Sequence, residues 1–367
     1  MALPQIDDYL ALFLNDTPMM DLRAPVEFAQ GAFPNTLSLP LMSDDERQKV
    51  GTCYKEQGQD KAIELGYTLV SGEVLGARMA LWATFVEENP DGVLYCFRGG
   101  LRSRLTQQYI YEQTGVAYPR INGGYKALRR YLINELENSV AKIEPLILSG
   151  STGTGKTQLL LRIQQSVDLE GIFSHRGSAF GRRVLEQPSQ IDVENQLSIA
   201  LLKLRHQGVQ RVVFEDEGSN IGSRCVPNSL IVKTSNSPVV VLDASVEERA
   251  AIIYQEYVTD ALAEYQQVQG DELGFVAWSE NLINSLGRIK RRLGGVRHKA
   301  LMDLLTQALA AHGTDEAVAK HMTLIGDLLV NYYDPMYDYQ LSQKSERIEF
   351  RGEAEAVMEY VHEQGIR

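Results

Sequence analysis

The sequence has few cysteines and histidines, and this shortage excludes whole classes of site. Its 367 residues include only three cysteines, Cys53, Cys96 and Cys225. They are too few for a disulfide framework, and they lack the paired spacing of a zinc site. The six histidines are scattered, without the spacing of a metal pair on one helix face. We therefore predict no metal site, and we expect any cysteine chemistry to be that of a single thiol.

The apolar residues are dispersed rather than gathered in long runs. No window approaches the roughly 18 uninterrupted apolar residues of a membrane span, and there is no low-complexity tract. The first 18 residues carry acidic side chains where a secretory signal would carry positive charge. We expect a soluble, cytoplasmic protein with no membrane partner. Its net charge of -12 opposes nucleic-acid binding over the whole surface but leaves room for a local basic patch.

The first part of the chain alternates between strand and helix patterns. The length and the ordinary composition, 44% hydrophobic and 23% charged, predict two to three globular domains. Short strands are predicted to end at Asp21 and Pro40, a buried strand covers 93–95, and a helix covers 103–111. Such βαβ alternation predicts a parallel sheet, in which ligands lie beyond the carboxyl ends of the strands. Cys96 stands at one of these ends.

A second alternation begins near Ile143. A predicted strand at 146–148 leads into a glycine-rich loop, and a helix is predicted over 158–165. Two further strands, 211–214 and 239–242, each end in acidic residues. From about residue 245 onward the periodicity is mostly helical, so we place domain boundaries near residues 140 and 245.

The first motif with chemical content is CFRGGLRS, which begins at Cys96. Its two glycines let the loop curl so that backbone N–H groups point at the sulfur, and the following helix N-terminus adds positive potential. With two arginines nearby, the loop should favour the thiolate, which is a nucleophile at neutral pH. A buried core cysteine is the alternative, but glycines and arginines are poor core neighbours. The predicted cradle of the sulfur is Arg98, Gly99, Gly100, Leu101, Arg102 and Ser103.

This loop resembles the active-site loop of the rhodanese family, which places a cysteine first and closes on an arginine and a Ser or Thr before a helix. The upstream segments 21–28 and 31–35, followed by Pro40, look like the N-terminal signature of the same family. Ala32 and Phe33 depart from it, since His and an aliphatic residue are usual there. The resemblance implies that Cys96 carries sulfur or selenium as a persulfide or selenosulfide.

The second motif, GSTGTGKT, is a full match to the P-loop pattern. Backbone N–H groups of such a loop wrap phosphate oxygens, Lys156 supplies a point charge, and the Thr157 hydroxyl could hold Mg²⁺. A predicted strand before the motif and a helix after it strengthen the assignment. The predicted phosphate loop consists of Gly150, Ser151, Thr152, Gly153, Thr154, Gly155, Lys156 and Thr157.

Two polar clusters are predicted to assist the phosphate loop. Glu215, Asp216 and Glu217 end a predicted strand and could manage a metal ion or water, although a solvated strand end would look the same. A second cluster is suited to phosphate or RNA-backbone contact through charge-assisted hydrogen bonds. A lone histidine in such a cluster is more often structural. The second cluster consists of His175, Arg176 and Ser178.

Basic residues gather in one short stretch broken by two glycines. On an acidic protein such a stretch predicts the electrostatic footprint of RNA, with a solvated helix face as the alternative. Three basic residues after Tyr125 could extend the footprint toward Cys96, and the Tyr125 ring could stack on a splayed base. The predicted RNA-binding residues are Tyr125, Lys126, Arg129, Arg130, Arg288, Lys290, Arg291, Arg292, Arg297 and Lys299.

A rhodanese-like loop followed by a phosphate loop on one chain resembles the tRNA 2-selenouridine synthase family. The segments 51–55, 122–126, 174–181 and 332–337 add to this resemblance. The resemblance implies that selenium replaces sulfur in 2-thiouridine at the anticodon wobble position of tRNA, with selenophosphate as donor. It also implies an S-geranyl intermediate made from geranyl diphosphate. Since both cosubstrates carry phosphate, ATP need not be the ligand of the phosphate loop.

We therefore predict an α/β protein with three parts. A rhodanese-like parallel-sheet domain covers 1–138, a P-loop α/β domain covers 139–245, and a helical C-terminal region covers 246–367 and packs on the P-loop domain. The predicted function is that of a tRNA-modifying transferase. Two alternatives stay open: a rhodanese-type sulfurtransferase with an attached nucleotide-hydrolysing domain, and a non-enzymatic tRNA-binding or persulfide-sensing module.

Overall fold

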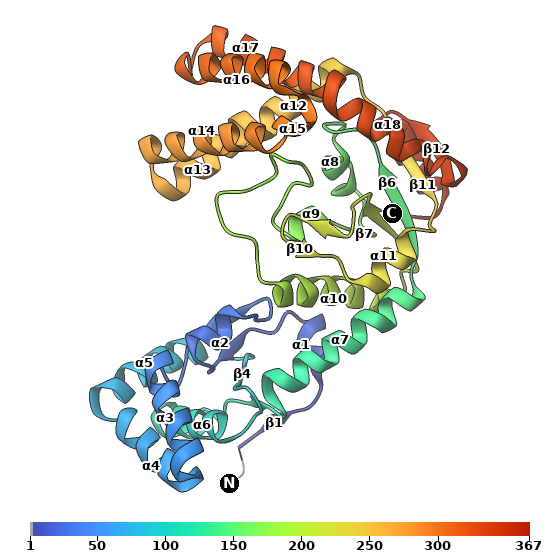
Figure 1. The fold of residues 1–367 in the computed structure, drawn as a ribbon. Helices are drawn as coiled ribbons and strands as arrows, with labels where there is room; N and C mark the ends of the chain where they lie inside the picture. Colours follow the sequence, from blue (N-terminus) through green and yellow to red (C-terminus); the bar gives the residue numbers. More distant parts are fainter. Residues whose placement is uncertain (1–2) are drawn as a thin grey trace. The chain divides into compact units, whose positions relative to one another are not determined.

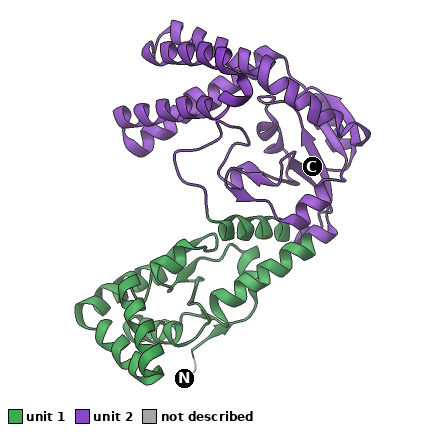
Figure 2. Cartoon of the chain, in the orientation of Figure 1, with its two compact units in different colours: residues 1–139, 189–203 green, residues 140–188, 204–367 purple. Residues whose placement is uncertain are grey.

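The computed structural model describes residues 3–367 and divides the chain into two compact units (Figures 1 and 2). Unit 1 comprises residues 1–139 and 189–203, and unit 2 comprises 140–188 and 204–367. Helix α10 (Gln190–His206) therefore begins in unit 1, although the chain has already entered unit 2 before it. The sequence patterns gave no indication of this return.

Unit 1 is built on a parallel sheet of five short strands in the order β1-β5-β4-β2-β3. The side chains of Met20 and Leu94 are fully buried, as expected for a parallel sheet covered on both faces. The predicted strands that end at Asp21 and Tyr95 are confirmed. The strands are β1 (Gln5–Ile6), β2 (Met19–Asp21), β3 (Thr36–Ser38), β4 (Val93–Tyr95) and β5 (Arg120–Ile121).

Helices surround this sheet. Helix α3 begins at a capping box, in which the Ser43 hydroxyl accepts from the N–H of Glu46 and the Glu46 carboxylate accepts from the N–H of Ser43. The helices of unit 1 besides α10 are α1 (Tyr9–Leu14), α2 (Pro25–Ala29), α3 (Asp44–Gln57), α4 (Gln59–Leu69), α5 (Gly72–Glu88), α6 (Leu101–Thr114) and α7 (Gly124–Lys142), which runs on into unit 2.

Unit 2 contains a second five-stranded parallel sheet, in the order β12-β11-β6-β8-β7. The edge strand β12 (Ile348–Gly352), whose residues alternate between partly buried and exposed positions, was not predicted, because the region from about residue 245 was interpreted as helical. The other strands are β6 (Glu144–Ser149), β7 (Ser166–Val167), β8 (Arg211–Glu215) and β11 (Val239–Leu242), with an antiparallel pair β9 (Asn220–Ile221) and β10 (Arg224–Cys225) beside them.

The predicted helix over 158–165 is wrong in extent. Helix α8 covers only Lys156–Leu160, because the Ser166 hydroxyl donates to the carbonyls of Leu160 and Ile163 and the chain turns there into β7. The other short helices of unit 2 around the sheet are α9 (Leu169–Ile172), α11 (Asn228–Thr234) and α19 (Ala354–Glu363).

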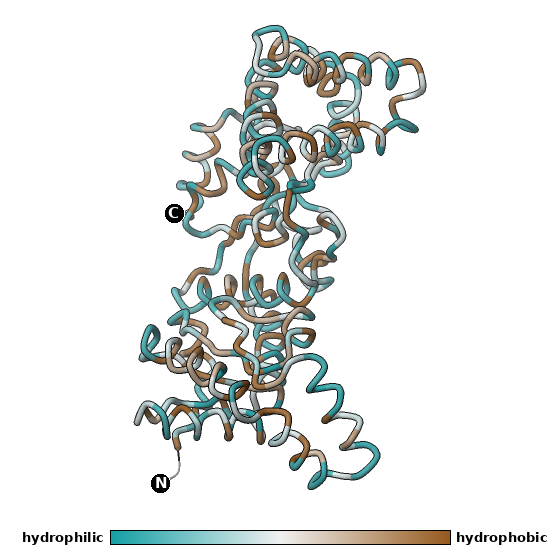
Figure 3. Tube along the Cα trace, turned by 90° about the vertical axis from the view of Figure 1, so that its left-hand side faces the viewer, coloured by the Kyte–Doolittle hydropathy of each residue, from teal (hydrophilic) through white to brown (hydrophobic). Residues whose placement is uncertain are grey.

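The predicted helical C-terminal region is confirmed, apart from β12. Its core surrounds Trp278, whose indole N–H donates to the Tyr257 carbonyl at 3.0 Å. The chain trace alternates between hydrophobic and hydrophilic residues along these helices (Figure 3). The elements are α12 (Val246–Tyr254), π-helix η1 (Gln255–Asp260), α13 (Ala261–Gln269), α14 (Asp271–Arg288), α15 (Lys290–Leu293), α16 (Gly295–Ala310), α17 (Asp315–Leu328), π-helix η2 (Leu329–Tyr333), α18 (Asp334–Ser342) and the 3-10 helix η3 (Ser345–Arg347).

Within residues 3–367 no single helix is both long and apolar enough to cross a membrane, although α4 and α5 meet the criterion together as a pair bent by 83°.

Candidate functional sites

Cys96 directly follows β4 and lies at the carboxyl end of the sheet of unit 1. Its side chain is buried, and the residue is 3% exposed. The thiol donates to the Ser103 hydroxyl, with 3.3 Å between Sγ and Oγ, and that hydroxyl donates to the Gly100 carbonyl at 3.0 Å. The predicted loop thus closes on itself through Ser103, at the start of α6.

The N-terminus of α7 holds this loop from outside. The N–H groups of Tyr125 and Lys126 donate to the carbonyls of Cys96 and Phe97 at 2.9 and 3.0 Å. Gly124 has a φ of +58°, and a Cβ there would lie 2.2 Å from the Cys96 carbonyl oxygen. Only glycine fits such a close approach of two backbones.

Two arginines beside the Cys96 loop, Arg102 and Arg120, donate hydrogen bonds to different partners. Arg102 donates to the Glu27 carboxylate at 2.8 Å; burial would raise the pKa of Glu27, but this hydrogen bond and the Arg102 charge lower it. Arg102, which was predicted to stabilise the sulfur of Cys96, is therefore also paired with the Glu27 carboxylate. Arg120, which no motif singled out, donates to the Gly99 carbonyl at 2.8 Å. Burial and Arg104 lower the pKa of Arg120, and Cys96 opposes them.

Tyr125 belongs to the core of unit 1. It is 7% exposed, and the Arg23 guanidinium lies 3.6 Å from the centroid of its ring. Arg23 is itself held by a buried ion pair of 2.6 Å with Asp21, so the segment 21–23 has a structural role. The prediction that Tyr125 stacks on a base is contradicted by this burial.

The basic residues that follow Tyr125 have different environments. Arg129 pairs with Glu194 and donates to the Asn195 side chain at 2.9 Å, which ties α7 to α10 within unit 1. Lys126 and Arg130 are exposed. Of these three predicted RNA contacts, Arg129 is therefore engaged within the protein.

A cavity of about 370 Å³, here called the α4 cavity, lies beside the helix that follows the Cys96 loop. Leu101, Arg102 and Leu105 of α6 form one wall of it, and α3 and α4 supply mostly apolar residues to the others. The remaining lining residues are Leu41, Met42, Val50, Tyr54, Gln59, Ala62, Ile63, Gly66, Tyr67, Val70 and Tyr109.

The phosphate loop of unit 2 connects β6 to α8, as the motif predicts. Gly153 and Gly155 have φ angles of +80° and +81°, which favour glycine. The Lys156 ammonium donates to the carbonyls of Gly150 and Ser151 at 2.8 and 3.1 Å. The lysine is thus folded back on its own loop, where a bound phosphate would give it a stronger acceptor.

The structure separates the three acids at the end of β8, Glu215 to Glu217, which the sequence left equivalent. Glu215 accepts a hydrogen bond of 2.6 Å from the Thr157 hydroxyl and so faces the phosphate loop. Asp216 instead accepts from the Ser149 hydroxyl and from Lys344, each at about 2.5 Å. Its charge is therefore neutralised by the Lys344 ammonium.

Two carboxyl groups at this loop are hard to ionise. Burial, together with the negative charge of Glu170, raises the pKa of Glu215 to about 7. The same two causes raise the pKa of Glu217 to about 8, with Lys156 opposing them. Sequence reasoning missed Glu170, which also accepts from the N–H of Gly177. These two carboxyl groups beside the phosphate loop can therefore hold protons near neutral pH. A cationic ligand would favour loss of these protons, and an anionic ligand would favour their retention.

The oxygen atoms of Thr157 and Glu215 are of the kind that Mg²⁺ binds in P-loop proteins. Among residues 3–367, however, no group of three or more His, Cys, Asp or Glu side chains is arranged to hold a metal ion.

The predicted cluster of His175, Arg176 and Ser178 is split between two cavities. Arg176 and Ser178 line the phosphate-loop site together with Glu217. Arg176 lies 3.5 Å from the Glu264 carboxylate and 5.3 Å from the ring of Tyr257. His175 lines a separate, arginine-rich cavity instead.

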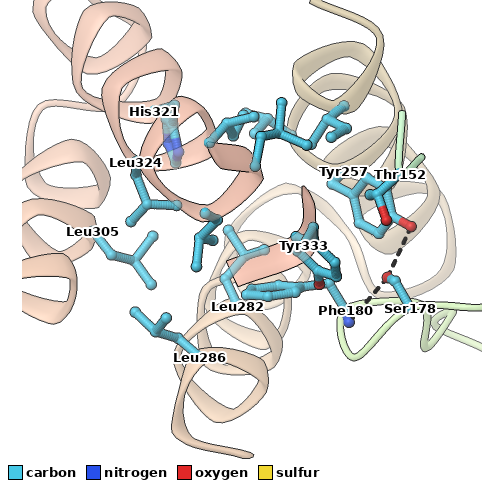
Figure 4. Close-up of a pocket in the computed structure, with 15 residues that line it drawn as sticks. Thr152, Ser178, Phe180, Tyr257, Leu282, Leu286, Leu305, His321, Leu324 and Tyr333 are labelled. Atoms are coloured by element: carbon cyan, nitrogen blue, oxygen red, sulfur yellow. Dashed lines mark hydrogen bonds between the residues drawn. The ribbon is translucent and has the colours of Figure 1, made fainter. Parts of the chain in front are cut away.

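An apolar cavity, here called the leucine cavity, opens beside the phosphate loop (Figure 4). Its polar end is formed by Thr152 of the loop and by Ser178, whose hydroxyl lies 2.9 Å from that of Tyr257. The cavity is narrow, about 50 Å³. Two π-helices contribute to it, η1 through Tyr257 and η2 through Tyr333; such segments are frequent at functional sites. The other lining residues are Phe180, Ile253, Val258, Leu282, Leu286, Leu305, His321, Leu324, Ile325, Leu328 and Leu329.

The predicted basic stretch is mostly exposed. Arg288 is exposed as well, but it also lines the arginine-rich cavity and donates to the Ala179 carbonyl at 2.7 Å. Arg297 lies 3.5 Å from the Asp327 carboxylate. The exposed residues that make no ion pair with a carboxylate within residues 3–367 are Lys290, Arg291, Arg292 and Lys299.

The parallel sheet, the phosphate loop and the acidic strand end define unit 2 as a P-loop α/β protein with an added helical region. Residues 143–366 match the model of the tRNA 2-selenouridine synthase AAA domain. Relatives named tRNA 2-selenouridine synthase are 51% identical over 357 residues in Marinobacter nauticus, covering 97% of each chain, and 50% identical over 360 residues in Pseudomonas fluorescens, covering 98% of each. The chain belongs to the tRNA 2-selenouridine synthase family.

Proposed function

We propose that this protein replaces the sulfur of wobble 2-thiouridine in tRNA by selenium, through an S-geranyl intermediate, with geranyl diphosphate and selenophosphate as cosubstrates. The names of its relatives support formation of 2-selenouridine in tRNA. The observation that carries the geranyl step is an apolar cavity that shares Thr152, Ser178 and Tyr257 with the phosphate-loop site. A ligand with a charged diphosphate head and an apolar tail fits this pairing.

In the first step, the sulfur of 2-thiouridine attacks the carbon of geranyl diphosphate that carries the diphosphate. The carbon–sulfur bond forms, the carbon–oxygen bond breaks, diphosphate leaves with the electron pair, and the base loses its N3 proton. The phosphate loop stabilises the leaving group through backbone N–H groups, and Lys156 exchanges its loop carbonyls for phosphate oxygens. Thr157 and Glu215 are the groups that would hold Mg²⁺ carried by the diphosphate, which would neutralise part of its charge.

The geranyl chain enters the leucine cavity in this proposal. Because the cavity is narrow without a ligand, the leucines that line it must rotate to admit ten carbon atoms. Each buried methylene contributes about 0.8 kcal/mol, so geranyl diphosphate should bind at least about 100-fold more tightly than inorganic diphosphate. Calorimetric titration of the wild-type protein with both ligands tests this step. Equal affinities for geranyl diphosphate and inorganic diphosphate would show that the geranyl group does not bind in the leucine cavity.

In the second step, selenium from selenophosphate replaces the S-geranyl group at C2 of the base. The C2–Se bond forms and the C2–S bond breaks, geranylthiol leaves with a proton, and water takes the phosphoryl group as phosphate. No oxidation state changes, because selenium enters and remains at the selenide level. The α4 cavity beside the Cys96 loop offers an apolar place for the departing geranyl group.

The unchanged oxidation state of selenium in the second step restricts the role of Cys96. A selenosulfide on Cys96 would require an oxidant that selenophosphate does not supply. We therefore assign Cys96 to nucleophilic displacement: its thiolate attacks C2 and expels geranylthiol, and selenide then displaces the thiolate. Incubating the protein with S-geranylated tRNA in the absence of selenophosphate should release geranylthiol and leave the nucleoside on the Cys96 peptide, which mass spectrometry would detect. A persulfide or selenosulfide on that peptide instead would favour the carrier role.

The overall test is mass spectrometry of the wobble nucleoside after reaction with thiolated tRNA and each cosubstrate. Geranyl diphosphate alone should yield the S-geranyl nucleoside, and both cosubstrates together should yield 2-selenouridine. Phosphate release from ATP without RNA would favour a sulfurtransferase with a nucleotide-hydrolysing domain. Binding of tRNA without any turnover would favour the non-enzymatic alternative.

A further inference from the structure

A second polar cavity, here called the arginine cavity, lies in unit 2 beside the phosphate-loop site. Its volume is about 720 Å³, and it is formed by the segment 175–187, the β9–β10 pair and the end of α14. It shares Gly177 and Ser178 with the phosphate-loop site, so the two sites are adjacent. Its charged lining residues are Arg182, Arg183, Glu186, Arg224 and Arg288, together with His175.

The positive charge of this cavity is poorly compensated. The Arg182 side chain makes no hydrogen bond or ion pair within residues 3–367. Arg224 donates to the carbonyls of Pro188 and Gln187, and Arg288 to the Ala179 carbonyl and the Ser285 hydroxyl, all neutral acceptors. The carboxylates near the cavity include Glu186, which is exposed, and Glu264, whose Oε1 lies 3.8 Å from Arg183 and also faces Arg176. At the wall shared with the phosphate-loop site, Glu170 and Glu217 approach Gly177, whose N–H donates to Glu170.

Two buried nitrogen atoms at the cavity lack partners. The Nδ1 atom of His175 and the Nε atom of Arg183 make no hydrogen bond within the described residues. His175 is only 9% exposed. Burial lowers its pKa; a hydrogen bond to the Arg176 backbone opposes this effect, and the charges of Arg182, Arg288 and Arg183 add to it. An unsatisfied buried polar atom is costly unless a ligand or water pairs with it. The Arg183 Nε–H therefore favours a ligand that accepts hydrogen bonds, and the His175 Nδ1 favours a polar partner.

We propose that the arginine cavity binds phosphate groups, and that the RNA backbone beside the target base is their source. Arginine forks match phosphate oxygens in pairs, and a cavity of this volume is larger than one phosphate. The shared wall at Gly177 and Ser178 would let a nucleotide keep its phosphate in this cavity while its base reaches the diphosphate in the phosphate loop. The choice of RNA rests on the proposed function, whereas the binding of phosphate does not.

Arg182 is the residue to change, because it is exposed and its side chain makes no hydrogen bond or ion pair within residues 3–367. Arg182→Ala should weaken binding of an unmodified anticodon stem-loop RNA about 5- to 10-fold near 0.1 M salt and lower the slope of log Kd against log salt by about 0.7 to 0.9, the value for one lost phosphate contact. Arg162→Ala is the matched control, since Arg162 is a half-exposed arginine of the same unit that pairs with Glu355 outside the cavity. It should leave both quantities unchanged.

The alternative source is a small phosphate, which thermal shift with inorganic phosphate tests in the same variants. Loss of phosphate stabilisation in Arg182→Ala with unchanged RNA affinity would confirm the phosphate site and overturn RNA as its source. If the wild-type protein binds RNA and Arg182→Ala responds to RNA and to inorganic phosphate as the wild type does, the phosphate site in the arginine cavity is overturned and the proposed function is not. Absence of RNA binding by the wild-type protein would instead contradict the proposed function. Arg288→Gln provides a second variant, which should reproduce the direction of the Arg182→Ala result.

Discussion

The Cys96 loop and the phosphate loop are held in place by hydrogen bonds from different kinds of group. Around Cys96 most of the contacts are made by neutral groups: N–H groups of α7 hold the loop carbonyls, and the thiol bonds to a neutral hydroxyl, whereas Arg120 on the Gly99 carbonyl is a charged contact. Around the phosphate loop, by contrast, the contacts are made by ionisable side chains: Lys156 donates to loop carbonyls, and Glu215 accepts from the Thr157 hydroxyl. The first site should therefore be sensitive to shape, and the second to charge and protonation.

This difference also separates the two proposed steps. Geranyl transfer needs a site that stabilises a departing diphosphate, and selenium exchange needs a positioned thiol. If the comparison is correct, substitutions in one unit should stop one step and spare the other.

The largest expected effect is that of Cys96→Ser. Removing the nucleophile should reduce formation of 2-selenouridine by about 10³-fold or more, while the S-geranyl nucleoside still forms and accumulates. Mass spectrometry of both nucleosides provides the measurement, and Cys225→Ser, at an exposed thiol of unit 2, is the control that should retain both steps. Selenouridine formation at the wild-type rate would remove Cys96 from the mechanism.

A smaller loss is expected from Gly124→Ala, which tests shape without touching a functional group. The added Cβ would meet the Cys96 carbonyl oxygen at 2.2 Å and the Gly99 nitrogen at 2.5 Å, so the loop must move. A displacement of about 1 Å can cost about 100-fold in rate, and only the selenium step should suffer.

Gly115→Ala separates this displacement from the cost of a positive φ. Gly115 has a φ of +73°, but a Cβ at this position would meet no other atom within 4 Å. Both variants should lose stability in thermal unfolding, but only Gly124→Ala should lose selenium exchange. Equal rates in the two variants would show that the loop tolerates the added atom.

Lys156→Ala tests the charge-dominated site. Hydrogen bonds to charged groups contribute about 1.5–3 kcal/mol, so the affinity for geranyl diphosphate should fall about 10- to 150-fold, as measured by calorimetry. Selenium exchange on tRNA that already carries the S-geranyl group should continue at the wild-type rate. A loss of both steps would mean that the two sites do not act separately.

The sequence predicted the parts of each site that are contiguous in the chain. Cys96 to Ser103 and Gly150 to Thr157 are local motifs, because a loop of eight residues contains most of the geometry that its chemistry requires. The buried strands were also predicted, since short apolar runs between turn residues are distinctive. The edge strand β12 was missed because it is only five residues long and lies in a region whose periodicity is mostly helical.

What the sequence could not predict comes from residues far apart in the chain. Arg120 reaches the Gly99 carbonyl, Glu170 approaches Glu215, and Tyr257 meets Ser178 only because the sheets and the helical region bring them together. None of these residues forms a motif with its partner. Tyr125 illustrates the reverse error, because an aromatic residue beside basic residues suggested base stacking, whereas its ring is covered by Arg23.

The smallest expected effect is a pH dependence confined to the phosphate loop. The pKa of Glu215 is raised to about 7 and that of Glu217 to about 8, and a bound diphosphate adds negative charge that raises both further. Binding therefore takes up protons, so the affinity for geranyl diphosphate without Mg²⁺ should fall several-fold as the pH rises from about 6 to about 9. Glu217→Gln should flatten this profile, whereas Glu247→Gln, at an exposed glutamate of the same unit, should retain it. An affinity that rises with pH, or a profile unchanged by Glu217→Gln, would show that protonation of these carboxyl groups does not control the site.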